Sequence, residues 1–162
     1  MTVTIRPTPP DHPQVLALIE QLDAYLAALY DPEDVYILDL EGLRLPSVTF
    51  LGAWDGEELV GCGAVRLMDA EPATDGQPYG EIKRMMVSAG RRGERIGERV
   101  LHALEQHLRD HGIDRALLET GPPQTAALRL YTRCGYAPRA AYGGYPDNAT
   151  ASVFMEKRWT AD

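Results

Sequence analysis

Residues 80–112, which read GEIKRMMVSAGRRGERIGERVLHALEQHLRDHG, decide the fold of this chain. Apolar residues near the start of the stretch predict a strand: Ile82, Met85, Met86 and Val87. Apolar residues further along recur at the period of an α-helix: Ile96, Val100, Leu104 and Leu108. Free backbone N–H groups and the positive end of the dipole at a helix start favour an anion, phosphate above all. The stretch therefore predicts a strand, an anion-binding loop and a helix in succession.

Length and composition are those of a single globular domain, residues 1–162, because 44% of the residues are hydrophobic and one core suffices for this length. No run of about eighteen apolar residues is present, so we expect no transmembrane helix. The first residues lack the pattern of a signal peptide, and Cys62 and Cys134 stand in no CxxC or disulfide-rich pattern. The expectation is a cytoplasmic protein with no membrane partner.

The net charge of −8 argues against a nucleic-acid partner, because nucleic-acid binders usually carry the opposite balance. Basic residues nevertheless gather between positions 83 and 99: Lys83, Arg84, Arg91, Arg92, Arg95 and Arg99. A local basic patch on an acidic chain again predicts a bound anion at this place.

The remaining elements alternate between the strand and helix periods. Helices are predicted over residues 13–30, with Asp11 as a cap, and over 124–134, with Gly135 as a left-handed C-cap. Strands are predicted over 3–6, 48–54, 59–68, 115–120 and 152–159, with an extended segment over 136–145. A turn at Asp55-Gly56 joins two of the strands in a hairpin, and 35–40 is a short helix or a loop. This order predicts an α/β or α+β domain with a mixed sheet.

Two motifs within these elements resemble those of one family. Residues 92–97, RGERIG, resemble the Q/R-x-x-G-x-G/A signature of the GCN5-related N-acetyltransferases (GNAT). Residues 124–136, QTAALRLYTRCGY, resemble the N-x-x-A-x-x-L-Y-x-x-x-G-F/Y segment of the same family, at a suitable separation. The resemblance implies a mixed, mostly antiparallel central sheet flanked by helices, and an N-acetyltransferase that uses acetyl-CoA and no metal.

The resemblance also implies the cofactor contacts. Main-chain groups of Met85, Met86 and Val87 would pair with the pantetheine. Main-chain N–H groups of the loop and helix start would hold the pyrophosphate: Arg92, Gly93, Glu94, Arg95, Ile96, Gly97 and Glu98. Gln124 stands where the family has an asparagine, which is a mild change.

Arg95 is the one marked departure, because the family has its first loop glycine there. Glycine allows the backbone to approach the pyrophosphate closely. Arginine in the first turn of a helix is disfavoured by the dipole unless an anion is bound. We expect Arg95 to face the cofactor, with Arg92 and Arg99 one turn to either side on the same face; the alternative is a weakened site.

Acetyl transfer needs an acid for the leaving thiolate and benefits from a base near the amine. Tyr131 matches the family's tyrosine and is the candidate acid; the structural alternative is a core tyrosine with a satisfied hydroxyl. Glu81 is the candidate base, and strand alternation would place Glu81, Lys83 and Met85 on one face. Its alternative is a strand-end glutamate that pairs with Lys83 or is solvated. Glu119 is a second candidate base, although an ion pair explains it better.

Acceptor recognition is predicted from residues outside the two motifs. Lys83 is a candidate for a substrate carboxylate, with a solvated lysine as the alternative. Tyr142 and Tyr145, followed by Asp147-Asn148, lie on a terminal hairpin that often adjoins the acceptor in this fold; turn chemistry explains Asp147-Asn148 equally well. Two further sets are better explained without a ligand: Cys134 as a buried structural thiol, and His107 and His111 as residues of a polar helix face.

The favoured interpretation is therefore an acetyl-CoA-dependent N-acetyltransferase that moves an acetyl group to a primary amine of a small molecule or a protein. The alternative, from a different class, is a non-catalytic module of the same fold that binds or senses acyl-CoA. The sequence leaves the acceptor and the oligomeric state open, with a homodimer as one alternative.

Overall fold

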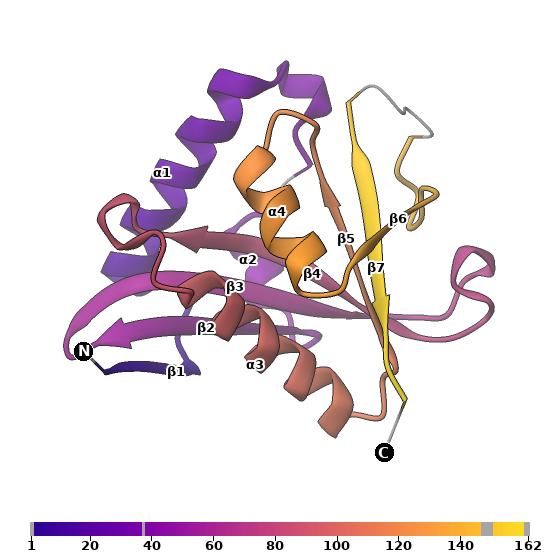
Figure 1. Ribbon diagram of the computed structural model, residues 1–162, viewed down its shortest axis with the longest axis horizontal. Coiled ribbons are helices and arrows are strands. Elements are labelled where there is room, and N and C mark those ends of the chain that lie inside the picture. Colours follow the sequence, from indigo (N-terminus) through magenta and orange to yellow (C-terminus); the bar gives the residue numbers. More distant parts are fainter. Residues whose placement is uncertain (1, 37, 147–150, 161–162) are drawn as a thin grey trace. The chain divides into compact units, whose positions relative to one another are not determined.

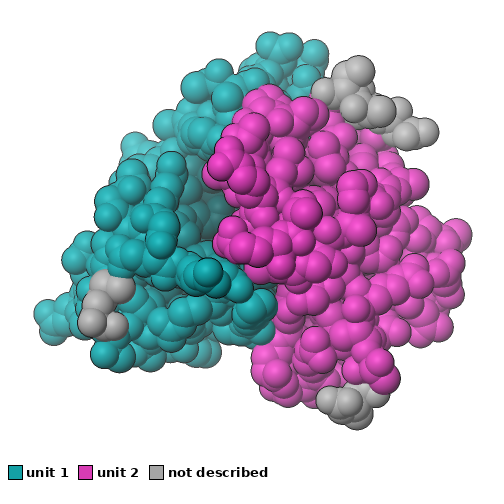
Figure 2. All heavy atoms as spheres, viewed as in Figure 1, with its two compact units in different colours: residues 1–66, 83–104 teal, residues 67–82, 105–162 magenta. Residues whose placement is uncertain are grey.

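A computed structural model describes residues 2–36, 38–146 and 151–160 (Figure 1). The chain forms two compact units, coloured separately in Figure 2. Unit 1 holds residues 1–66 and 83–104, and unit 2 holds residues 67–82 and 105–162. Strand β4 and helix α3 are continuous segments that belong to both units.

The helices and strands follow the predicted order closely. Within the described residues the strands are β1 (Val3–Pro7), β2 (Val48–Asp55), β3 (Glu58–Met68), β4 (Tyr79–Val87), β5 (Arg115–Thr120), β6 (Ala137–Arg139) and β7 (Val153–Arg158). The α-helices are α1 (Pro13–Leu29), α2 (Leu40–Leu43), α3 (Ile96–Asp110) and α4 (Thr125–Arg133). Short 3₁₀ turns are η1 (Pro32–Asp34), η2 (Pro72–Thr74) and η3 (Ala89–Arg91). None of the helices in the described ranges is long and apolar enough to cross a membrane.

The sheet has the strand order β1-β2-β3-β4-β5-β7-β6. The described registers of β1 with β2, β2 with β3, β5 with β7 and β6 with β7 are antiparallel. The register of β4 with β5 is parallel and joins Gly80 to Ala116 and Glu81 to Leu117. The predicted mixed α/β fold is therefore confirmed.

In unit 1, helices pack on both faces of the β2–β3 hairpin. One face carries a buried apolar cluster from α1, α2, β2 and β3: Val15, Leu18, Leu43, Phe50, Trp54, Leu59, Cys62 and Ala64. The other face lies against α3, where a Cβ on Gly63 would come within 2.8 Å of Val100 and 2.5 Å of Met85 Sδ. A larger residue than glycine would therefore push α3 away from β3.

Unit 2 has a core of its own, made of Tyr79, Leu117, Tyr142 and Phe154. Its part of α3 also lies close to the sheet, because a Cβ on Gly80 would be 2.3 Å from Leu108. The buried aromatic residues of this core bring the first part of the β6–β7 connection, at Tyr142, against Tyr79 at the start of β4. That arrangement determines the surroundings of Glu81.

Local sequence signals were right about the ends of several elements and wrong about two. Gly56 and Gly135 both have a positive φ, as their predicted turn and C-cap roles require. The cap of α1 is His12 and not Asp11, because the His12 side chain accepts a hydrogen bond from the Gln14 N–H. The extended segment over 136–145 is also shorter than predicted, since β6 ends at Arg139 and a turn follows.

Candidate active site

The predicted anion loop of unit 1 leads from β4 through η3 into α3. Arg92 is extended, Gly93 has a φ of 87° and Arg95 a φ of 61°. The Arg99 N–H donates to the Arg95 carbonyl oxygen at 3.1 Å, which begins the hydrogen bonding of the helix. The N–H groups just before Arg99 lie in the first turn and have no acceptor within the helix. Such donors suit an anion.

Arg95 precedes the helix and does not belong to its first turn. Its side chain is 75% exposed, and its Nη1 lies 3.7 Å from Glu98 Oε2. Because α3 begins at Ile96, helical spacing does not relate Arg92 to Arg95, and the prediction that Arg92, Arg95 and Arg99 share one helical face is wrong. The predicted contact of Arg95 with the cofactor stays a prediction.

Arg91 fastens the loop to the rest of unit 1. Its guanidinium lies 3.1 Å from Asp55 at the end of β2 and 3.0 Å from Glu94 within the loop. These ion pairs raise the pKa of Arg91, with the hydrogen bond to Glu94 as the main cause. Arg91 was predicted only as part of a basic patch, and its observed contacts are with carboxylates of the protein itself.

Strand β4 has an irregularity at Arg84, whose φ is 56°. The Arg84 side chain is buried, forms an ion pair with Asp23 of α1 and donates from Nε to the Leu38 carbonyl at 3.0 Å. The Arg84 carbonyl accepts from Cys62 Sγ at 3.4 Å. A left-handed residue interrupts strand alternation, so the prediction that Glu81, Lys83 and Met85 share one face is wrong.

Glu81 lies in unit 2, where it is only 3% exposed. Its Oε2 accepts hydrogen bonds from the hydroxyls of Tyr142 at 2.7 Å and Tyr145 at 2.8 Å. Burial and the negative charge of Glu81 raise the pKa of both tyrosines, so both remain protonated donors. The structure therefore joins three residues that the sequence had assigned to two roles, base and acceptor binding.

The turn that carries the two tyrosines is held by a second carboxylate. Gly143 and Gly144 have φ values of 61° and 78°. Glu71 accepts from the Gly143 N–H at 2.8 Å and from the Tyr79 hydroxyl at 2.7 Å. The positive φ favours glycine here, and a Cβ on Gly143 would also crowd the Tyr79 oxygen at 3.3 Å.

Tyr131 is buried on α4 of unit 2, as a core tyrosine would be. Its hydroxyl, however, makes no hydrogen bond to the residues that the structure describes. Burial is the main cause that raises its pKa, and the charges of Cys134 and Glu119 raise it further. By contrast, the nearby Tyr136 hydroxyl donates to Glu105 at 2.8 Å. The Tyr131 hydroxyl therefore has a proton that it does not donate to any described residue.

The other candidates have less distinctive settings. Gln124 precedes α4 without a side-chain cap, while Lys83 and Glu119 are half-buried. The rings of His107 and His111 lie 4.2 Å apart between centroids, tilted by 42° to each other. Asp147 and Asn148 lie outside the described residues.

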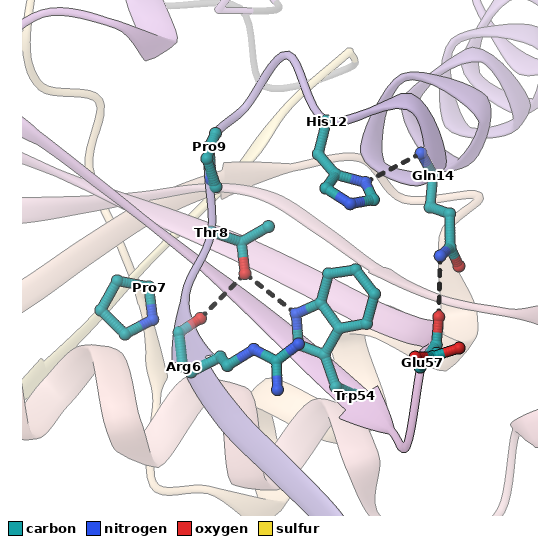
Figure 3. A pocket seen from close by; sticks show the side chains of 8 residues that line it. All are labelled: Arg6, Pro7, Thr8, Pro9, His12, Gln14, Trp54 and Glu57. Atoms are coloured by element: carbon teal, nitrogen blue, oxygen red, sulfur yellow. Dashed lines mark hydrogen bonds between the residues drawn. The ribbon is translucent and has the colours of Figure 1, made fainter.

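A pocket on unit 1, with a volume of about 370 Å³, contains none of the predicted site residues (Figure 3). It is lined by Arg6, Pro7, Thr8, Pro9, His12, Gln14, Trp54 and Glu57. Trp54 Nε1 donates to Thr8 Oγ1 at 3.0 Å, and Gln14 Nε2 donates to the Glu57 carbonyl at 2.8 Å. These bonds fix the start of α1 against β1 and the β2–β3 turn, which is a structural role.

Sequence reasoning missed Asp23 and Glu71, the carboxylates that hold Arg84 and the Gly143 turn. Each is far in sequence from the residue that it binds, and neither lies in a recognisable motif. The one sequence signal was an arginine, Arg84, within a predicted strand, because a buried arginine needs an acidic partner. The sequence does not indicate which acidic residue that partner is.

The fold and the glycine- and arginine-containing loop are those of an acetyltransferase. The model of the Acetyltransferase (GNAT) family matches residues 15–136. The chain therefore belongs to the GNAT acetyltransferase family, as the two motifs had indicated.

Named relatives agree with this assignment. The chain is 42% identical to an IAA acetyltransferase of Azospirillum brasilense over 96% of this chain and 97% of the relative. It is 35% identical to the uncharacterized N-acetyltransferase YsnE of Bacillus subtilis over 90% and 92% of the two chains.

Solved structures show the same fold. A putative acyl-CoA N-acyltransferase from Klebsiella pneumoniae is 38% identical, with a TM-score of 0.78 over 97% of both chains. PaiA N-acetyltransferase from Thermoplasma acidophilum, solved in complex with coenzyme A, is similar in fold at 17% identity, with a TM-score of 0.72 over 98% of this chain and 100% of that chain.

Proposed function

We propose that the chain is an acetyl-CoA-dependent N-acetyltransferase that moves an acetyl group directly to a primary amine of a small molecule or a protein. Family membership supports acyl transfer, and a relative in fold was solved with coenzyme A. The loop supports the choice of co-substrate, because the first N–H groups of a helix have no acceptor within that helix and fit a pyrophosphate. We assign pantetheine binding to the main chain of Met85–Val87 and pyrophosphate binding to that of Arg92–Glu98. We also assign Gln124, in the second motif, to cofactor binding.

The observation that carries the proposal is the Tyr131 hydroxyl, which belongs to a buried side chain and has no hydrogen-bond partner among the described residues. The phenol is protonated at neutral pH, and burial raises its pKa further, so its proton is present when a leaving thiolate needs one.

The amine nitrogen forms a bond to the acetyl carbon as the carbon–sulfur bond breaks. Glu81 takes a proton from the nitrogen, directly or through water, and Tyr131 gives one to the sulfur. The two proton transfers leave neutral amide and thiol products.

Substitution Tyr131→Phe tests this assignment, since it removes the proton donor and breaks no described hydrogen bond. We expect kcat for thiol release from acetyl-CoA to fall about 100-fold or more, while the Kd for acetyl-CoA in calorimetry stays within about twofold. Tyr136→Phe is the matched control, because it removes a nearby buried hydroxyl that binds Glu105, and its kcat should stay close to that of the unmodified protein.

The acceptor screen covers small primary amines, peptides with free lysines or N-termini, and IAA, for which the 42% identical relative is named. Full activity of Tyr131→Phe at every pH would contradict the role of the acid. Acetyl-CoA binding without transfer to any acceptor would instead favour the non-catalytic acyl-CoA-binding module.

A further inference from the structure

We propose that Tyr142 and Tyr145 are positioning residues that hold the Glu81 carboxylate for proton transfer, and do not bind the acceptor themselves. This inference rests on the proposed function, because it gives Glu81 the role of base. It starts from one geometric fact: both phenol hydroxyls donate to the same carboxylate oxygen, Glu81 Oε2, at 2.7 and 2.8 Å. Because both hydroxyls donate their hydrogen to Glu81, neither points that hydrogen at the substrate that accepts the acetyl group.

The turn between the two tyrosines, Tyr142-Gly143-Gly144-Tyr145, makes this convergence possible. Both glycines have a left-handed backbone, which reverses the chain and lets residues three apart reach one atom. Glu71 holds the middle of the turn through the Gly143 N–H at 2.8 Å. The turn is therefore fixed at its backbone and at both side chains.

Aromatic packing holds the rings as firmly as the hydrogen bonds hold the hydroxyls. The Tyr142 and Tyr145 rings are 5.3 Å apart, and they lie 5.7 and 5.5 Å from the Phe154 ring. Tyr79 packs edge-on against Tyr142 at 5.6 Å. Rings confined in this way cannot turn easily, so the direction of each O–H bond toward Glu81 is preserved.

A carboxylate in so buried a place needs donors to stabilise its charge. Hydrogen bonds from neutral donors to an ionised oxygen are shorter and stronger than those between neutral groups. Because burial and Glu81 raise the pKa of both phenols, these donors persist across the working pH range. Two of them on one oxygen also fix the orientation of the carboxyl plane, which proton transfer from an amine requires.

The test is a set of kinetic double-mutant cycles. Tyr142→Phe and Tyr145→Phe are each made in the unmodified chain and in a Glu81→Gln chain. We expect each single substitution to lower kcat about tenfold with the KM for acetyl-CoA within about twofold, and to have almost no further effect on kcat once Glu81 is Gln.

Tyr136→Phe is again the matched control, because it also removes a buried phenol that donates to a buried carboxylate, Glu105. It should lower the melting temperature as the other two do, yet its small effect on kcat should be the same in both chains. If Tyr142→Phe fails to fold, Tyr145→Phe still decides the question, because Tyr145 is the more exposed of the two.

Two results would overturn the inference while the proposed function stands. One is a rise in the acceptor KM with kcat unchanged, which would make the tyrosines acceptor-binding residues. The other is an equal loss of kcat with and without Glu81, which would show a structural effect only. Absence of acetyl transfer by the unmodified protein would instead overturn the proposed function, and this inference with it.

Discussion

Two arginines of unit 1 adopt the same unusual backbone in opposite surroundings. Arg84 in β4 has a φ of 56° and Arg95 in the loop a φ of 61°. The Arg84 side chain is 5% exposed and ion-paired with Asp23, whereas the Arg95 side chain is 75% exposed. A left-handed residue with a side chain costs roughly 1–2 kcal/mol. Tertiary contacts offset that cost at Arg84, while at Arg95 the strain lies in the loop to which we assign pyrophosphate binding.

The largest expected effect on stability comes from removing the ion-pair partner of the buried arginine, Arg84. Asp23→Ala leaves the Arg84 guanidinium buried without its carboxylate, and should lower the free energy of unfolding by about 2–3 kcal/mol. This figure allows for the exposure of Asp23, whose side chain is 40% exposed. Urea unfolding measures the change.

Asp11→Ala provides the control, because Asp11 pairs with Arg44 at 2.7 Å with both side chains about half exposed. The Asp11→Ala variant should lose less than about 1 kcal/mol of unfolding free energy. Equal losses of stability at the two positions would contradict the view that the buried Arg84 depends on its ion pair with Asp23.

A smaller effect concerns Cys62, which donates to the Arg84 carbonyl. Burial raises the pKa of this thiol from 9.0 to about 12, although the charge of Arg84 opposes the shift. Above pH 9 the unfolded chain loses the thiol proton while the folded chain keeps it. The stability that the protonated Cys62 thiol contributes is therefore fully present below pH 9. It is lost as the pH rises toward 12, by about 1.4 kcal/mol of unfolding free energy per pH unit.

Urea unfolding at pH 8 and pH 10 checks this dependence, with Cys62→Ala as the reference. The unmodified chain should lose about 1 kcal/mol more than the variant between the two pH values. Identical losses would mean that the thiol beside Arg84 is not shielded from water.

The smallest effect is expected at the exposed arginine, where stability and binding should move in opposite directions. Arg95→Gly removes the left-handed strain and should raise the free energy of unfolding by about 0.5 kcal/mol, since glycine also has more freedom to lose. The Kd for acetyl-CoA should rise about fivefold if the guanidinium reaches the phosphates.

Arg95→Asn separates charge from backbone, because asparagine tolerates a left-handed φ without carrying a charge. It should weaken acetyl-CoA binding as much as Arg95→Gly does in calorimetry. Tighter binding by either variant would show that Arg95 hinders the loop.

Local chemistry explains what could be predicted from the sequence. The strand over 115–120, the helix from Pro13 and the turns at Gly56 and Gly135 follow from periodicity and from the conformations that glycine and proline allow. The family motifs added the expected roles of Glu81 and Tyr131. The sequence also predicted that Tyr142 and Tyr145 bind the acceptor, which stays a prediction; their hydrogen bonds to Glu81 were not foreseen.

The sequence by itself determined the order of the elements, the family and the loop that begins α3, because these depend on neighbours along the chain. Tertiary structure decided which carboxylate receives which donor: Asp23 for Arg84, Glu71 for the Gly143 turn, and Glu81 for two tyrosines more than sixty residues away. Such pairings form only when packing removes water and brings a hydrogen-bond partner within reach of each buried polar group. For the same reason, the left-handed turn of Arg84 in β4 could be recognised only in the folded chain.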